Sequence, residues 1–134
     1  MAIYYGDGST SNDGRILQIK EGVMRTIITV SSSSDTAISG LSESITCYEA
    51  ASRVKIDIFI GCLGINSSNY YAFFTLYKDG SILGNSRGQT EGNRQRCSFA
   101  MRQNPAGHMG DAISFSYIDT PGDTNNHTYD LRVA

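Results

Sequence analysis

Histidine is the side chain that most often binds metals or moves protons near neutral pH, and this chain has two, His108 and His127. His108 lies in an expected loop between Gly107 and Met109, whereas His127 begins an expected strand. Neither histidine stands at a metal-ligand spacing from a cysteine or an acidic residue. We therefore expect no zinc or iron site.

A calcium loop would need oxygen ligands at a fixed spacing. Near the N-terminus, acidic and hydroxyl side chains alternate at Asp7, Ser9, Ser11 and Asp13. The acidic spacing and the closing bidentate glutamate of an EF-hand are missing. We expect a polar turn here, and no metal ligands in the chain.

Catalytic patterns are also missing from the sequence. Ser-His-Asp hydrolysis is often marked by a G-x-S-x-G elbow, which this chain lacks. A glycosidase would need two carboxylates that converge in a cleft, but nothing marks a pair among Glu21, Glu43, Glu49 and Glu91. We expect a non-enzymatic protein with no catalytic residues and no cofactor.

Three cysteines, Cys47, Cys62 and Cys97, form an odd set without a CxxC motif. All three lie inside apolar strand patterns, where cysteine behaves as a small hydrophobic residue. Buried free thiols are the first interpretation, and one bridge with a leftover thiol is the alternative.

The charge is close to neutral, with 11 Lys and Arg against 13 Asp and Glu, so the sequence shows no electrostatic footprint for nucleic acid. No apolar run approaches the roughly 20 residues that a membrane-spanning helix needs. The start MAIYYGDGS has neither the basic region nor the apolar region of a signal peptide. We expect no nucleic-acid partner, no membrane insertion and no export by the general secretory route.

Residues 53–65, RVKIDIFIGCLGI, are the longest apolar run. Val54, Ile56, Ile58 and Ile60 share one parity, which is typical of a strand buried on one face, and we expect it to be the central strand. About eight or nine strands are expected in all, with no helical period. The others cover residues 15–20 and 23–30, as two strands or one bent strand, and residues 36–39, 42–48, 70–78, 81–83, 94–102, 112–119 and 127–133. This pattern predicts an all-β protein, an antiparallel β-sandwich of the jelly-roll type.

The strongest local signal follows the aromatic segment YYAFFTLY, residues 70–77. Asp79-Gly80 supplies the positive φ angles of a type I′ turn, so residues 70–78 and 81–83 should form a hairpin. The aromatic segment is apolar on both faces, which suits a strand between two layers or at a subunit interface.

Two regions divide the chain. Residues 1–14 are expected to form an extended N-terminal arm that ends in a Gly-rich polar turn, and residues 15–134 to form the β-domain. The arm carries Ile3, Tyr4 and Tyr5. A short segment cannot bury three large apolar side chains within itself, so it must dock on its own domain or on a neighbour. We expect the neighbour.

A family resemblance runs along nearly the whole chain. It is carried by GDGSTSNDGRILQIK, ITVSSSSDTAISGLSESIT, RVKIDIFIG, RQRCSFAM, ISFSYIDTP and HTYDLRV. In these segments the chain resembles small bacteriophage virion structural proteins, such as those of cyanophages and other marine phages. The order of strands also looks like the jelly roll of tumour necrosis factor and of the complement globular head, which implies a compact homotrimer.

The resemblance implies a non-enzymatic virion protein, a trimeric decoration or cement protein on the outer capsid surface. Its partners would be itself and the major capsid protein or other virion proteins, and it would assemble in the cytoplasm of the bacterial host. The alternative is the tip of a tail fibre that binds a host-surface glycan or receptor. Apolar surface beyond one core face marks the expected trimer interface, Tyr71, Phe74, Leu76, Tyr129 and Leu131.

Overall fold

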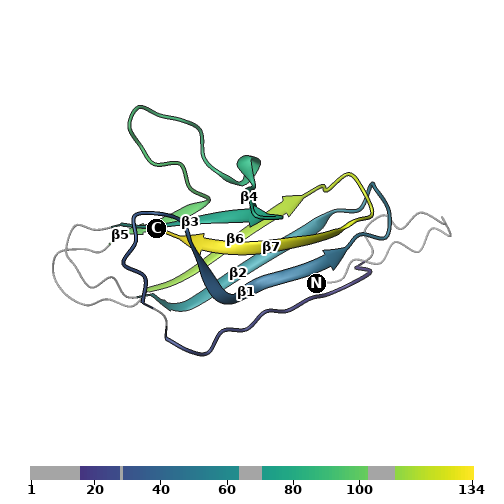
Figure 1. The fold of residues 1–134 in the computed structure, drawn as a ribbon, viewed down its shortest axis with the longest axis horizontal. Coiled ribbons are helices and arrows are strands. Elements are labelled where there is room, and N and C mark those ends of the chain that lie inside the picture. The colour runs from purple at the N-terminus through teal and green to yellow at the C-terminus, as the bar shows by residue number, and fades with distance from the viewer. Residues whose placement is uncertain (1–15, 28, 64–70, 103–110) are drawn as a thin grey trace.

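The computed structural model describes residues 16–27, 29–63, 71–102 and 111–134 (Figure 1). The regular secondary structure of the described chain is all strand, apart from one short 3-10 turn. The elements are β1 (Thr36–Thr46), β2 (Val54–Leu63), β3 (Tyr71–Lys78), β4 (Ser81–Ile82), η1 (Gly84–Ser86), β5 (Phe99–Arg102), β6 (Asp111–Asp119) and β7 (Asn126–Val133). The predicted all-β class is confirmed. Among the described residues, no helix has the length and apolar character needed to cross a lipid bilayer.

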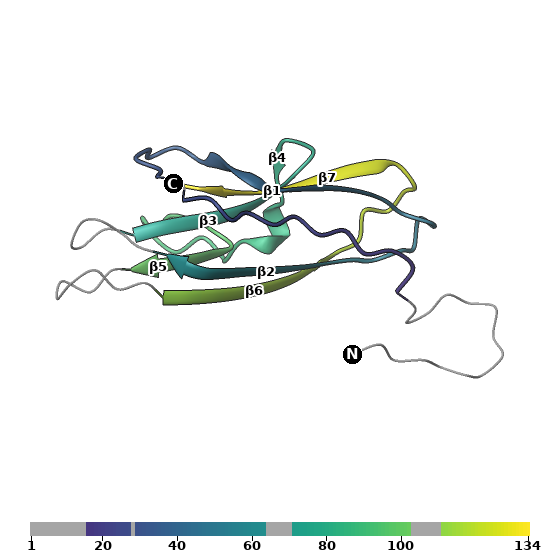
Figure 2. The same ribbon diagram turned by 90° about the horizontal axis from the view of Figure 1, so that it is seen from below.

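The strands form two antiparallel sheets. The larger has the order β1-β7-β3-β4, with β5 pairing beside β4 on the same edge of β3, and the smaller is the pair β2-β6. Seen edge-on, the two sheets lie as two layers, a sandwich-like arrangement (Figure 2). Each layer presents one face of its strands to the other, so alternate residues of every long strand point inward.

The core lies between the two layers. On β7, Tyr129, Leu131 and Val133 share one parity, point inward and are buried. Phe99 of β5 stacks between Phe74 of β3 and Phe115 of β6, with ring centroids 4.7 and 5.0 Å apart. This aromatic stack joins the larger sheet to the smaller one.

The predicted hairpin is confirmed. Tyr77 pairs with Ile82 and Lys78 with Ser81, and the connecting Asp79 and Gly80 have φ angles of 52° and 75°. Positive φ at both central residues is what a type I′ turn requires, which explains the Asp-Gly sequence.

The expectation that residues 53–65 form the central strand is wrong. The strand is present as β2, and Ile56, Ile58 and Ile60 pack on the core, but among the described residues β2 pairs only with β6. β7 and β3 occupy the middle of the larger sheet. Apolar alternation reports which face is buried, whereas position within a sheet depends on strand pairing, which the alternation does not encode.

The expected strands over residues 15–20 and 23–30 are also wrong, because the described residues from 16 to 35 contain no strand. This segment instead runs beside β1 (Figure 1). Two strands were expected around Gly40, but β1 is one strand whose pairing with β7 shifts between Ala37 and Ser42. Gly40 has a φ of 89°, so this shift is a bulge at the position where glycine is required. Only Phe99–Arg102 of the strand expected over residues 94–102 is strand.

Candidate functional site

The most unusual surface is the apolar segment, which we define as residues 16–27. Five of its large side chains are exposed, and Ile27 is 97% exposed. They are Ile16, Leu17, Ile19, Val23 and Ile27. Scattered single apolar residues are normal on a protein surface, but five on one short segment form a larger exposed apolar surface.

Close packing on β1 holds the apolar segment in place. A Cβ atom on Gly22 would lie only 3.0 Å from the carbonyl oxygen of Gly40 and 3.1 Å from Oε1 of Glu43. A Cβ on Gly40 would in turn lie 3.4 Å from Cβ of Met24. Met24 is the side chain that turns inward and packs on the core. The segment is therefore seated on the bulge of β1 while its other apolar side chains face outward.

The outer face of the smaller sheet carries a second exposed apolar group, the ring of Phe59, which is 72% exposed. Beside it, Asp57 accepts hydrogen bonds from Lys55 at 2.9 Å and from Ser116 at 2.7 Å, and these bonds lower the pKa of Asp57. A shallow depression is lined by Asp57, Ile58, Phe59, Ser114, Phe115 and Ser116. This face combines an open aromatic ring with hydrogen-bonding groups.

Four of the five residues expected at a trimer interface lie in the core of the single chain. Phe74, Leu76 and Leu131 are each 1% exposed, and Tyr129 is also buried. Tyr71 alone is open, at 47% exposed, and Arg102 lies 5.5 Å from the centre of its ring. All four side chains belong to the core between the two sheets and are already covered by the chain itself, so they leave no surface for a neighbour.

The arm residues Ile3, Tyr4 and Tyr5 lie outside the described residues, as do the calcium-like positions Asp7 to Asp13 and His108. Cys47 and Cys97 are free thiols, the first buried and the second half-buried. The side chain of Cys62 lies outside what the structure describes.

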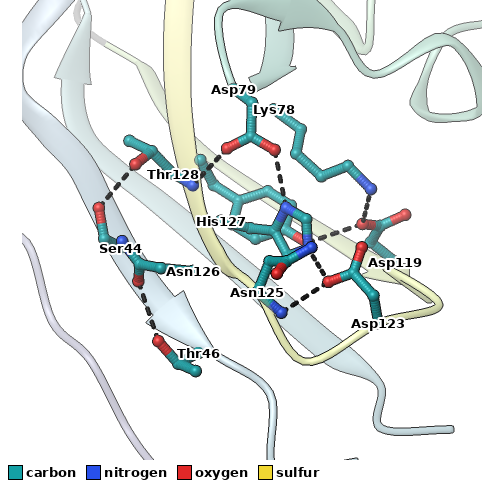
Figure 3. A network of polar contacts seen from close by, with 11 residues as sticks. Ser44, Thr46, Lys78, Asp79, Asp119, Asp123, Asn125, Asn126, His127 and Thr128 are labelled. Atoms are coloured by element: carbon teal, nitrogen blue, oxygen red, sulfur yellow. Dashed lines mark hydrogen bonds and ion pairs between the residues drawn. The ribbon is translucent and has the colours of Figure 1, made fainter. Parts of the chain in front are cut away.

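A buried histidine between two carboxylates forms the main polar site (Figure 3). Nδ1 of His127 lies 2.7 Å from Oδ2 of Asp79, and Nε2 lies 2.9 Å from Oδ1 of Asp123. The hydrogen bonds to Asp79 and then to Asp123 raise the pKa of His127 and outweigh its burial, which acts in the opposite direction. We call Asp79, Asp123 and His127 the histidine clamp.

The clamp joins three separate parts of the chain. Asp79 belongs to the β3–β4 turn, Asp123 to the loop between β6 and β7, and His127 to the start of β7. Each carboxylate also accepts a backbone N–H, Asp79 from Thr128 at 2.8 Å and Asp123 from Asn125 at 2.7 Å. These bonds, together with those from His127, lower the pKa of both carboxyl groups.

Further polar pairs surround the clamp. The buried carboxylate of Asp119 accepts hydrogen bonds from the hydroxyl of Tyr129 at 2.7 Å and from Nζ of Lys78 at 3.0 Å. Burial, and then this hydrogen bond, raise the pKa of Tyr129 strongly, so its hydroxyl stays protonated. The hydroxyls of Ser44 and Thr128 share a bond of 2.7 Å between β1 and β7 (Figure 3).

The geometry of the clamp suits charge pairing. Both ring nitrogens of His127 face carboxylates, so neither is directed at a serine or cysteine that it could activate. Burial raises the pKa of the Cys47 thiol, which disfavours the reactive thiolate. In the parts of the chain that the structure describes, no group of three or more His, Cys, Asp or Glu side chains is arranged to hold a metal ion.

The histidine clamp was not predicted from the sequence. Asp123 precedes His127 by four residues, and the Asp79-Gly80 turn was recognised, so each part carried a local signal. The missing information was that the turn and the start of β7 meet, although 48 residues separate Asp79 from His127. Pairing of β3 with β7 supplies that proximity.

Comparisons of the chain with protein-family models, with curated proteins and with solved structures found no match.

Proposed function

We propose that this chain is a non-enzymatic structural protein of a bacteriophage virion. In this role it is a jelly-roll homotrimer that decorates or cements the outer capsid surface, and it assembles in the cytoplasm of the bacterial host. The observation that carries the proposal is the exposed apolar segment on an otherwise well-packed all-β domain. A particle component needs surfaces that neighbouring subunits cover more than it needs a pocket, and trimer avidity strengthens weak individual contacts.

The proposed contact surfaces differ from those that the strand pattern favoured. Phe74, Leu76, Tyr129 and Leu131 are already covered by the chain itself. We assign the contacts between subunits to the apolar segment and to Tyr71, a further exposed apolar side chain. The arm residues Ile3, Tyr4 and Tyr5 keep the proposed role of docking on the major capsid protein or another virion protein.

A second function, the tip of a tail fibre, is favoured by the outer face of the smaller sheet. An exposed ring such as Phe59 offers a flat apolar surface on which the apolar face of a sugar can rest. Asp57 and Ser116 lie beside it as hydrogen-bonding groups. In this alternative the ligand is a host-surface glycan or receptor.

Quantitative mass spectrometry of purified phage particles that encode this chain tests both functions. A copy number close to that of the major capsid protein is expected for a decoration or cement protein. A few trimers per particle would reject decoration and favour the tail-fibre tip. Absence of the chain from the particles would reject the virion proposal altogether.

A further inference from the structure

The strongest unassigned feature is the protonation requirement of the histidine clamp. Neutral imidazole has one N–H donor and one acceptor nitrogen, whereas imidazolium has two donors. Both nitrogens of His127 lie within hydrogen-bonding distance of carboxylate oxygens, at 2.7 and 2.9 Å. A carboxylate cannot donate a hydrogen bond, so both contacts are satisfied only when His127 is protonated.

The two carboxylates are held with different firmness. Asp79 sits in a two-residue turn whose flanking residues pair in register, and its second oxygen accepts the N–H of Thr128 on β7. Asp123 lies in the connection between β6 and β7, next to Gly122 with a φ of 85°. One oxygen of Asp123, Oδ1, accepts both Asn125 N–H and His127. Loss of one contact of His127 should therefore release Asp123 and keep Asp79.

We propose that the histidine clamp is a pH-operated latch, in which protonated His127 holds residues 120–125 against the β3–β4 turn and neutral His127 releases them. On release, the ring keeps its proton on Nδ1 and its bond to Asp79, and Nε2 becomes an unprotonated acceptor that faces Asp123. The latch acts within the single chain and is independent of the virion role.

Several other charged or titratable groups come near His127. Lys78 of β3 and Asp119 of β6 form an ion pair of 3.0 Å, which leaves little net charge from these two elements. Tyr129 donates to Asp119, and Cys47 follows β1 as a protonated thiol. The two clamp carboxylates therefore dominate the field at the imidazole.

The sign of the pH dependence follows from these contacts. Because the pKa of His127 is raised on folding, its stabilising effect is fully present below the ordinary histidine value and is lost as pH rises through the raised pKa. The lowered pKa values of Asp79 and Asp123 act at the other end, since their effect is present above their ordinary values and is lost in acid. The latch is closed in mildly acidic solution and opens as pH rises.

The test is an NMR titration of the full chain, with His108 as the second histidine for comparison. The ring nitrogens of His127 report its tautomer, and amide exchange reports the loop through the N–H of Asn125. Across the titration of His127, we expect both ring nitrogens to be protonated at low pH and only Nδ1 at high pH. The protection factor of the Asn125 amide should fall about tenfold over the same range, while that of Leu83 in the hairpin stays constant.

Two variants make the test specific. Asp123→Asn should lower the pKa of His127 and leave the Asn125 amide weakly protected at every pH, because the charge that holds the loop is removed. Asp57→Asn, which removes a paired carboxylate from the outer face of the other sheet, should change neither measurement. The proposal is overturned if Asn125 protection does not follow the titration of His127, or if the neutral ring keeps its proton on Nε2.

Discussion

Tyr129 is a core residue whose side chain carries one polar atom, the hydroxyl oxygen, and the partner of this hydroxyl affects the stability of the fold. Its ring packs in the core between the two sheets, while its hydroxyl donates to Asp119 at 2.7 Å. Asp119 is itself buried and forms an ion pair with Lys78. A buried carboxylate depends on such partners, because an unpaired charge in the protein interior is strongly unfavourable.

Tyr129→Phe should lower the free energy of unfolding by about 1.5–3 kcal/mol, the usual contribution of a hydrogen bond to a charged group. Urea unfolding followed by circular dichroism measures the change. Tyr48→Phe is the matched control, because Tyr48 is 73% exposed and lies outside the core. Equal effects of the two substitutions would contradict the role given to Asp119.

At the residue scale, the sequence predicted which face of a single strand is buried, but it did not predict contacts between side chains of separate segments. The shared buried face of Val54, Ile56, Ile58 and Ile60 was predicted correctly, because alternation along a strand is a local property. The partners of His127 come from a turn and a loop elsewhere in the chain. No spacing rule brings those together before the sheet is known.

The elements of the larger sheet depend on one irregularity in β1. Gly40 allows the bulge by its φ of 89°, and it also lets Met24 of the apolar segment approach the strand. The same glycine therefore sets the twist of an edge strand and seats the segment that runs beside it.

Gly40→Ala should destabilise the fold by about 1–2 kcal/mol, because an L-residue is strained at this φ. Thermal or urea unfolding provides the measurement. Gly88→Ala serves as the control, since nothing lies within 4 Å of a Cβ placed there. A Gly40→Ala protein as stable as the Gly88→Ala protein would show that the bulge accepts a side chain.

At the scale of elements, the sequence predicted where strands lie better than which strands pair with each other. The hairpin was correct because Asp79-Gly80 encodes its own turn. Residues 23–30 have the β-branched composition of a strand, yet the described part of them contains none. Composition measures how well side chains fit a pleated surface, while a strand also requires a neighbour that offers a free edge in register.

At the scale of the whole molecule, the exposed apolar segment leads to a test of self-association. If the proposed virion role is correct, the full chain should sediment as a trimer at micromolar concentration. Ile19→Ser combined with Ile27→Ser should shift it to the monomer, because less apolar area is buried on association. Analytical ultracentrifugation measures the shift, and an unchanged circular dichroism spectrum shows that the fold is kept.

Glu91→Ser, on an exposed loop, is the control for this experiment and should leave the trimer intact. A trimer that persists in the double variant would move the interface to another surface, such as the face that carries Phe59. A full chain that is monomeric at all concentrations would remove the trimer from the proposal.

The position of β7 has a consequence for how the chain acquires its fold in time. β7 lies between β1 and β3 in the larger sheet, although it follows every other described strand in the chain (Figure 1). Even the shortest link between β1 and β7, from Thr46 to Asn126, spans 80 residues. On the ribosome, β1 and β3 are therefore made long before the strand that joins them. Until β7 emerges, both keep open edges, and the growing chain depends on slow, long-range closure and on protection from aggregation.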